Sequence, residues 1–293
     1  MANANTSRGV WLVVAGSLVI SSYGVWSKVL GDSFGPLGQS WVRSLITCLM
    51  ILPILLWGNH LLRIKREDWK WMAIYIIATS ATSAPIYYAF NHMDIGSAYL
   101  LFFVGMLLTM ALMGFAHFKE KITTSKVTAI ILAFVGLSII FSFSIEKFTL
   151  LAASLALLNG VASGAEVAIS KKLTNYSSLY LVFISYLSIF ATNGLLSIIT
   201  HEVQKIPPVS SAWTFIAIFA FTGVLGFWLL LKGVQYLESS IGGLLSPLEA
   251  VFGIILGAII FHEVITGRMI IGGSLIVIAA ALPHIVELYR RKA

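Results

Sequence analysis

The sequence predicts an all-α membrane protein with ten transmembrane helices, arranged as two five-helix repeats of inverted topology. Three observations predict this fold class: the composition, the lengths of the apolar segments, and a motif that recurs after 143 residues. Of the 293 residues, 58% are hydrophobic and 11% are charged, whereas about 25% of the residues in an ordinary soluble domain are charged. A chain this apolar cannot cover a large soluble domain with polar surface, so its expected environment is a bilayer.

Ten apolar segments follow one another along the chain, and most contain about 20 residues. At a rise of 1.5 Å per residue, such a helix crosses a hydrocarbon core about 30 Å thick, whereas β-barrel strands would be half as long and would alternate in polarity. The predicted spans are approximately 10–30, 37–57, 71–90, 95–118, 127–143, 150–169, 179–200, 213–231, 241–261 and 269–288.

Charges, short connections and Pro85 characterise the first five predicted spans. A single arginine, Arg8, precedes span 10–30 and no small-residue cleavage site follows it, so we expect a retained span and not a signal peptide. Span 37–57 contains one charge, Arg43, and span 71–90 contains Pro85, which predicts a kink. The connection 91–94 is so short that span 95–118 must return antiparallel to its predecessor, and span 127–143 completes the first half.

The second five spans repeat this order. Span 150–169 carries a polar face, and spans 179–200 and 213–231 follow it. A very short connection, 237–239, makes span 241–261 antiparallel to the span before it, and Pro247 predicts a second kink. The Gly-rich span 269–288 ends the chain.

The distribution of basic residues predicts the orientation. If the N-terminus lies on one side, that side receives most of the 19 basic residues: Arg8, Arg63, Lys65, Arg66, Lys70, Lys119, Lys121, Lys126, Lys171, Lys172, Lys232, Arg290, Arg291 and Lys292. The positive-inside rule then places both termini in the cytoplasm, and we expect the inner (plasma) membrane of a bacterium. Because the net charge of +7 comes from residues between apolar segments, we read it as a topology signal and expect no binding to nucleic acid.

An internal repeat divides the chain into two halves, expected at 1–147 and 148–293. The stretch Phe118–Thr123 (FKEKIT) recurs as Phe261–Thr266 (FHEVIT), and the same offset aligns Ser27-Lys28 with Ser170-Lys171. Five is an odd number, so the second half enters the membrane from the opposite side. Inverted repeats of this kind build alternating-access carriers. The alternative is a gene duplication that kept a fold without a transport role, and we favour transport.

The ten spans in two halves, each closing with Phe-x-Glu-x-Ile-Thr and a Gly-rich helix, resemble the EamA-type family of the drug/metabolite transporter superfamily. The resemblance covers essentially the whole chain and is strongest over 244–253, 261–263 and 271–276. The first half departs from it, because Val104-Gly105 stands where the second half has Pro247-Leu248 and no acid answers Glu249. The resemblance implies a multi-pass carrier of small organic metabolites, often amino acids, that are commonly exported. It also implies a central cavity surrounded by the first, third, fourth, sixth, eighth and ninth spans, with the fifth and tenth at the periphery.

Two acids inside the spans are the first candidates for substrate binding. Glu249 shares a helix face with Ser246, Gly242 and Gly253; the alternative is a packing seam of small residues, although a seam requires no carboxylate. Glu166 shares a face with Asn159 and Ser163; the alternative is that its side chain extends toward the cytoplasmic surface and pairs with Lys171.

Aromatic residues complete the predicted cavity. The repeat maps Glu166 onto Tyr23, and Trp26 lies beside Tyr23 in the same polar stretch. Tyr87, Tyr99 and Trp228 are candidates for stacking on the substrate, although aromatic residues in apolar helices are mostly packing residues. We expect Arg43 to be structural, paired with backbone carbonyls or an acid, or reaching the outer interface.

These features predict a secondary transporter of a small polar or zwitterionic metabolite, with amino-acid-like compounds favoured and export expected. The alternatives are a multidrug or organic-cation exporter, a lipid translocase or scramblase, and an intramembrane enzyme. The sequence lacks a GxxxxGK[ST] loop, an HExxH pair and a GxSxG elbow, so we expect no enzyme, no catalytic residues, no cofactor and no metal. The expected partners are the small-molecule substrate, membrane lipid and, if Glu249 or Glu166 exchanges a proton for the substrate, protons. The oligomeric state stays open.

Overall fold

The computed structural model describes residues 2–30, 33–58, 63–93, 95–141, 149–203, 207–208 and 210–292, with the side chains of all but 2–4, 36, 91 and 287–292. The predicted boundary between the repeats, at 147 and 148, lies outside these residues, as do Lys147 and Lys205. The described part of the chain is helical and contains no strand.

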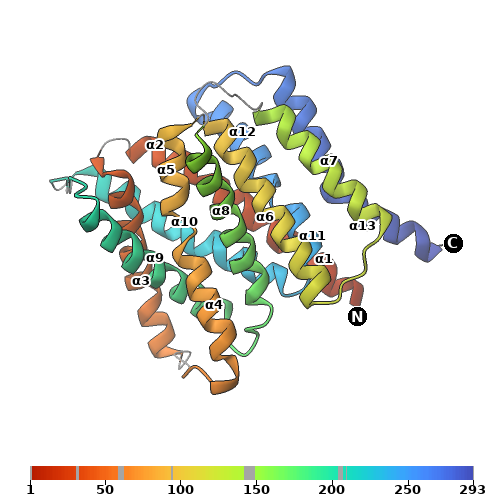
Figure 1. The fold of residues 1–293 in the computed structure, drawn as a ribbon, viewed down its shortest axis with the longest axis horizontal. Coiled ribbons are helices and arrows are strands. Elements are labelled where there is room, and N and C mark those ends of the chain that lie inside the picture. Colours follow the sequence, from red (N-terminus) through yellow and green to blue (C-terminus); the bar gives the residue numbers. More distant parts are fainter. Residues whose placement is uncertain are drawn as a thin grey trace.

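The helices follow the predicted order (Figure 1). Those of the first half are α1 (Ala2–Ser21), α2 (Tyr23–Leu30), α3 (Pro36–Trp57), the short 3-10 helix η2 (Arg66–Asp68), α4 (Trp69–Ser80), α5 (Ala84–His92), α6 (Ile95–His117) and α7 (Thr124–Phe141). Those of the second half are α8 (Leu150–Ser170), α9 (Ser178–Ile199), α10 (Ser211–Val234), α11 (Ser239–Leu245), α12 (Leu248–Phe261) and α13 (Gly267–Lys292).

Nine helical segments of the described chain are long and apolar enough to cross a membrane, among them α1 with α2 and α11 with α12. The predicted span 71–90 differs from the rest, because two shorter helices, α4 and α5, take its place. Pro85 explains the break: it has no N–H for the carbonyl of Ala81, and proline is favoured in the first turn of a new helix such as α5. Pro247 separates α11 from α12 in the same way.

The closest helix pairs each join one half of the chain to the other. They are α6 with α8, α7 with α13, α1 with α10, and α3 with α9. In Figure 1 the α7–α13 pair forms one edge of the molecule and the α3–α9 pair lies toward the opposite edge, with the remaining helices between them. The two repeats are therefore units of sequence that fold into one body.

Glycines let α6 and α8 meet backbone to backbone. A Cβ added to Gly105 of α6 would lie 2.6 Å from the carbonyl oxygen of Leu157 in α8. One added to Gly160 of α8 would overlap the carbonyl oxygen of Phe102 in α6. Lipid gives helices no hydrophobic reason to associate, so van der Waals contact through small residues supplies the attraction.

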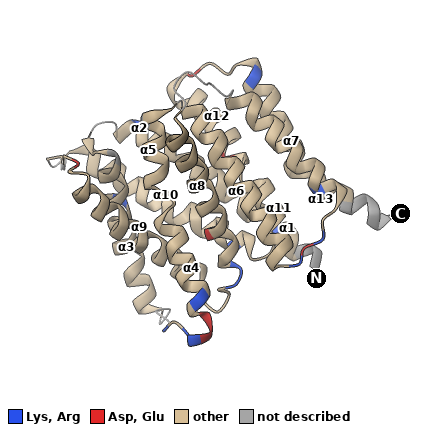
Figure 2. Cartoon of the chain, in the orientation of Figure 1, with Lys and Arg blue, Asp and Glu red and all other residues tan. Residues whose placement is uncertain are grey.

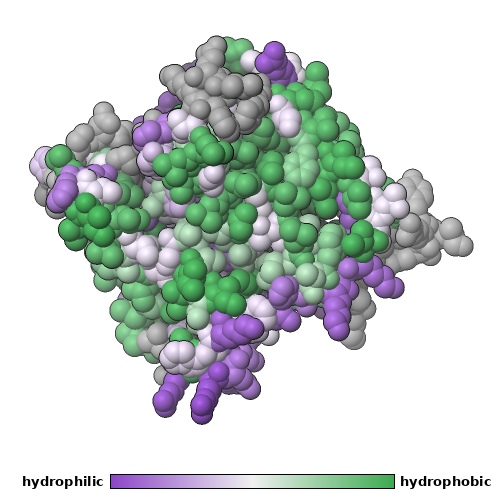
Figure 3. Space-filling view, in the orientation of Figure 1, coloured by the Kyte–Doolittle hydropathy of each residue, from purple (hydrophilic) through white to green (hydrophobic). Residues whose placement is uncertain are grey.

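The surface is apolar around the bundle and charged at its ends. Large hydrophobic side chains such as Trp57, Ile77 and Ile198 are exposed, and apolar residues cover most of the face in Figure 3. Basic residues gather at the end of the bundle that holds the N-terminus and the start of α4 (Figure 2). This surface suits a bilayer, with lipid against the sides and water at the ends.

The α6–α8 contact makes a stability prediction. Gly160→Ala places a methyl group against the backbone of Phe102, and we expect it to lower the free energy of unfolding by about 1–3 kcal/mol. The shift in Tm of the purified protein in detergent measures this loss. Gly253→Ala is the matched control, because a Cβ there meets nothing within 4 Å, and its Tm should stay the same or rise. Equal Tm values for both variants would contradict the close contact.

Candidate functional site

A cavity of about 270 Å³ lies between the two halves. Residues from α1, α2, α3, α5, α6, α8, α9, α10 and α12 line it, together with the 81–83 break. Its walls combine aromatic and apolar side chains with two acids, Glu166 and Glu249, and one base, Arg43. A cavity that combines both signs of charge with apolar walls suits a small polar solute with an apolar body.

Glu166 is buried on α8 and held by a neighbouring helix. The hydroxyl of Ser185, on α9, donates a hydrogen bond of 2.5 Å to Oε1 of Glu166. Lys171, the partner considered from the sequence, instead lies beyond the end of α8 and pairs with Glu120. Glu166 therefore faces the cavity and does not extend to the surface.

Glu249 lies in the first turn of α12, directly after the break at Pro247. No hydrogen bond or ion pair joins its side chain to another residue that the structure describes. A carboxylate there is stabilised by the partial positive charge of the α12 N-terminus, which makes it an available partner for a cationic group.

An aromatic group occupies the Arg43 side of the cavity. The hydroxyls of Tyr23 and Tyr186 are 3.0 Å apart, and the ring of Tyr23 packs edge-on against Phe219 at 5.1 Å. The guanidinium carbon of Arg43 lies 4.3 Å from the centre of the Phe219 ring and 5.0 Å from that of Tyr23. Aromatic faces thus hold the only base that lines the described cavity.

The cavity continues toward one end of the bundle. A second hollow of about 370 Å³ shares Ile20, Tyr23, Tyr99 and Glu249 with it, and reaches Lys28, Gly96 and Glu263. Lys28 and Glu263 form an ion pair of 2.8 Å in which each side chain is more than half exposed. We call this the Glu263 end, and the shared lining residues place the second hollow between the cavity and this end.

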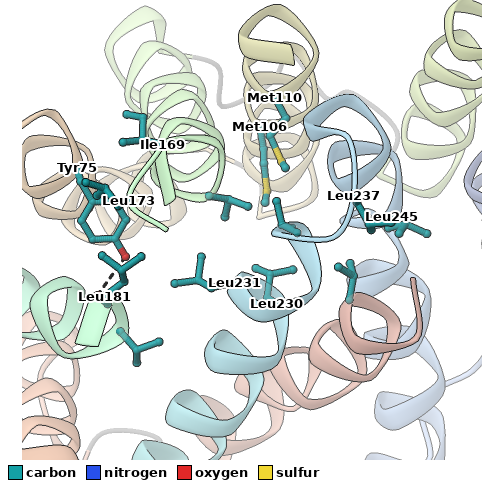
Figure 4. Close-up of a cluster of buried hydrophobic side chains, with 14 of the residues drawn as sticks. Tyr75, Met106, Met110, Ile169, Leu173, Leu181, Leu230, Leu231, Leu237 and Leu245 are labelled. Atoms are coloured by element: carbon teal, nitrogen blue, oxygen red, sulfur yellow. Dashed lines mark hydrogen bonds between the residues drawn. The ribbon is translucent and has the colours of Figure 1, made fainter. Parts of the chain in front are cut away.

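Apolar side chains fill the opposite direction. Next to Met106 and Leu230, which line the cavity, lies a buried apolar cluster that includes residues of the loops at the other end (Figure 4): Tyr75, Met110, Ile169, Leu173, Leu181, Leu231, Leu237 and Leu245. The hydroxyl of Tyr75 donates a 3.1 Å hydrogen bond to the carbonyl oxygen of Leu181 across this cluster. We call this the Glu120 end. A hollow of about 690 Å³ at this end, lined by Lys126, Leu237 and Leu245 among others, shares no lining residue with the cavity.

Glu120 fastens the loops at that end. Its carboxylate accepts hydrogen bonds from the backbone N–H groups of Ser239 and Ser240, the first residues of α11, and from the Ser240 hydroxyl at 2.6 Å. Lys171 approaches it to 3.5 Å and donates a 2.5 Å bond to the carbonyl oxygen of Leu237. Burial lowers the pKa of Lys171, and the Glu120 charge opposes that shift. These bonds tie the first half to α8 and α11.

The two copies of Phe-x-Glu-x-Ile-Thr adopt the same turn. The residue before each glutamate has a left-handed backbone, with φ of 53° and 56°. This turn brings the N–H of Glu120 to 3.0 Å from the carbonyl oxygen of Gly114, and that of Glu263 to 3.3 Å from Gly257. The motif therefore encodes one backbone structure that occurs once at each end of the bundle.

The fold and the sequence both have known counterparts. The model of the EamA-like transporter family matches the chain twice, over residues 7–142 and 150–283. The chain belongs to the EamA-like transporter family. A solved structure described only as a crystal structure of a protein superimposes with a TM-score of 0.82 at 16% identity, covering 96% of this chain and 97% of that one. No curated protein sequence matches the chain.

The helices that line the cavity match those that the resemblance implied, except that two further helices also contribute. No residue of α7 or α13, the fifth and tenth predicted spans, lines the cavity. Helices α3 and α9, which the resemblance did not include, contribute Arg43, Ser185 and Tyr186. The second and seventh spans therefore also shape the cavity.

Seven of the ten predicted site residues line this cavity in the EamA-like fold: Glu249, Glu166, Ser163, Asn159, Tyr23, Tyr87 and Tyr99. The other three lie elsewhere. The hydroxyl of Ser246, directly after α11, donates to the carbonyl oxygen of Gly242 at 3.1 Å. Trp26 donates to the Ser22 hydroxyl at 3.1 Å, and Trp228 packs against the apolar core.

Sequence reasoning assigned no binding role to Arg43, Ser185 and Tyr186. Of these three residues, only Arg43 stood out in the sequence as a possible functional residue, because it is the one charge in span 37–57. The sequence offered no acid for it at helical spacing, and the structure places it on the cavity wall without one.

The contrast between the two glutamates makes a prediction. Glu120→Gln removes the charge that accepts the α11 N–H groups, and we expect a loss of about 2–3 kcal/mol in unfolding free energy, read as a lower Tm. Glu263→Gln is the matched control, because its exposed ion pair contributes about 0–1 kcal/mol. Similar Tm shifts for the two variants would show that the hydrogen bonds of Glu120 contribute no more to stability than the exposed ion pair of Glu263.

Proposed function

We propose that this EamA-like protein is a secondary transporter that exports a small polar or zwitterionic, amino-acid-like metabolite by alternating access. Membership in a transporter family supports solute transport in general. The single observation that carries the more specific proposal is the cavity itself, which holds an unpaired acid between the two halves and adjoins a second hollow toward the Glu263 end.

The proposed architecture has ten spans in two inverted halves. Helices α4 and α5 together form the third span, since α5 continues toward the Glu263 end after the 81–83 break. Glu120 and Glu263 stand at equivalent positions of the repeat, yet they lie at opposite ends of the bundle. An inverted repeat of two five-span halves accounts for this placement.

In the proposed cycle the two ends open in turn. The described conformation has its Glu120 end closed by the apolar cluster and the Glu120 bonds, and its Glu263 end open. By the positive-inside rule the Glu120 end faces the cytoplasm, so this conformation faces outward. In the alternate conformation the equivalent contacts exchange between the ends, which exposes the cavity to the cytoplasm for loading.

The lining favours a solute that carries an ammonium group. Glu249 and Glu166 supply negative charge, Asn159 and Ser163 supply polar contacts, and Tyr99 supplies an aromatic face. A purely apolar compound would leave the acids of the cavity unpaired, which costs free energy. The direction of export rests on the resemblance to the family.

The orientation can be tested by labelling. We expect single cysteines in the 58–70 and 201–210 loops of a Cys48→Ala background to react with a membrane-impermeant maleimide from opposite sides, because 14 of the 19 basic residues lie on the predicted cytoplasmic side. Spheroplasts report the outer side and inverted vesicles the cytoplasmic side. Labelling of both loops from one side would refute the topology.

The role of Glu249 can be tested by transport. One carboxylate that binds either a proton or an ammonium group can exchange one for the other, because the two ligands compete. Glu249→Gln in proteoliposomes should lower amino-acid counterflow by about 10- to 100-fold, that is about 1.4–2.8 kcal/mol, and remove its dependence on a pH gradient.

Glu67→Gln serves as the control for this experiment, since its carboxylate is exposed in the loop before α4 and lies outside the cavity and the second hollow. It should keep the pH dependence of the parent protein. A folded Glu249→Gln protein that transports at the parent rate with the same pH dependence would exclude Glu249, and the packing-seam interpretation would replace it.

A further inference from the structure

We propose that Arg43 and the amino-terminal end of α5 form an anion-binding subsite in this cavity. The subsite takes the carboxylate of a zwitterionic substrate while Glu249 takes its ammonium group. The inference rests on the proposed transport function and narrows its substrate class from polar solutes to zwitterions.

Arg43 is a buried base without an acid. It is 7% exposed, and it lies about two turns into α3 among the rings of Phe219, Tyr23 and Tyr186, at 4.3, 5.0 and 5.8 Å from their centres. Its Nε atom makes no hydrogen bond, and no carboxylate of the described residues lies within 4.0 Å of it. Aromatic faces position the guanidinium but accept none of its five N–H donors.

A buried guanidinium in a membrane span is costly unless it has a partner or a function. Its planar donors match a carboxylate in a two-bond geometry, which a lysine ammonium cannot reproduce. The Arg43 side chain lines the same cavity as Glu249 and Glu166 and is therefore accessible to a solute there. These properties make it a receptor for a carboxylate.

The start of α5 adds positive potential at the same place. The helix is interrupted at 81–83, so the N-terminus of the nine-residue helix α5 lies within the predicted span. Thr82, Ser83 and Ile86 line the cavity there, together with Arg43. The Ser83 side chain makes no capping bond to α5; its hydroxyl pairs instead with Ser40, one turn before Arg43 in α3. The N-terminus of a discontinuous helix stabilises an anionic substrate group through its N–H groups and dipole.

The acids and Arg43 are the two charged poles of the cavity, no ion pair joins them, and tyrosines lie beside both. Tyr186 contacts both Arg43 and the Tyr23 hydroxyl, and its neighbour in sequence, Ser185, holds Glu166. A zwitterion satisfies both poles at once. An organic cation would leave Arg43 unpaired and meet its repulsion, and a simple anion would meet the acids, so the arrangement selects against both.

The test compares molecules that differ only in the carboxylate. Affinities of the purified chain in detergent are measured for L-phenylalanine, L-leucine and L-threonine, for their amides, and for the amines that lack the carboxyl group. The expected result is at least tenfold tighter binding of the best amino acid than of its amide or its amine.

Variants assign this preference to Arg43. Arg43→Gln should weaken binding of the amino acid at least tenfold and leave the amine within threefold of the parent protein. Arg43→Lys should retain part of the preference, and Lys65→Gln, in the exposed loop before α4, should retain all of it. A merely structural arginine would change Tm without changing the ratio between acid and amine.

The outcomes separate the two proposals. Transport of amines or amides as well as amino acids by the parent protein, or an Arg43→Gln protein with an unchanged acid-to-amine ratio, overturns the subsite and leaves the carrier function in place. Failure to bind or transport any of the nine compounds removes the amino-acid-like function and the subsite with it. If Arg43→Gln does not fold, the comparison of acid, amide and amine on the parent protein still decides.

Discussion

The hydrocarbon core of a bilayer offers a polypeptide no hydrogen-bond partner, and the helices of this protein satisfy their backbones internally for that reason. The same constraint limits where a helix can be broken. The breaks at 81–83 and at 246–247 are both accompanied by hydroxyls that bond back to the preceding turn, Thr82 to the carbonyl oxygen of Thr79 at 2.7 Å and Ser246 to that of Gly242 at 3.1 Å. Broken backbone thus occurs beside the cavity, where polar groups are available.

Packing between the halves follows from the absence of a hydrophobic driving force among lipid tails. Contact through glycines such as Gly105 and Gly160 brings α6 and α8 together, and Gly136 meets Gly272 in the same way between α7 and α13. Because the closest pairs all cross from one half to the other, neither half has a core of its own. The repeat is visible in the sequence and in the turns around Glu120 and Glu263, and it does not correspond to two separate domains.

Much of the fold was predictable because hydropathy reports directly on the environment of each helix. The apolar segments appear as helices near the predicted bounds, and the exception, 71–90, is broken by the proline that predicted a kink there. The cavity was less predictable, because a sequence gives helical spacing but not the rotation of a helix about its axis. Glu166, Asn159 and Ser163 could be grouped by their common face, whereas Trp26 and Trp228 offered no such pattern and lie in packing positions. Arg43 lacked an acid at helical spacing, and only the three-dimensional arrangement showed that rings from α2, α9 and α10 surround it.

The two ends of the bundle also differ in how far water and dissolved ions reach their ion pairs. Lys28 and Glu263 are more than half exposed, whereas Lys171 and Glu120 are 14% and 5% exposed. Mobile ions screen exposed charges over a Debye length of about 8 Å at physiological ionic strength and screen buried pairs much less. A rise in ionic strength therefore weakens the Lys28–Glu263 ion pair and leaves the Lys171–Glu120 ion pair nearly unchanged.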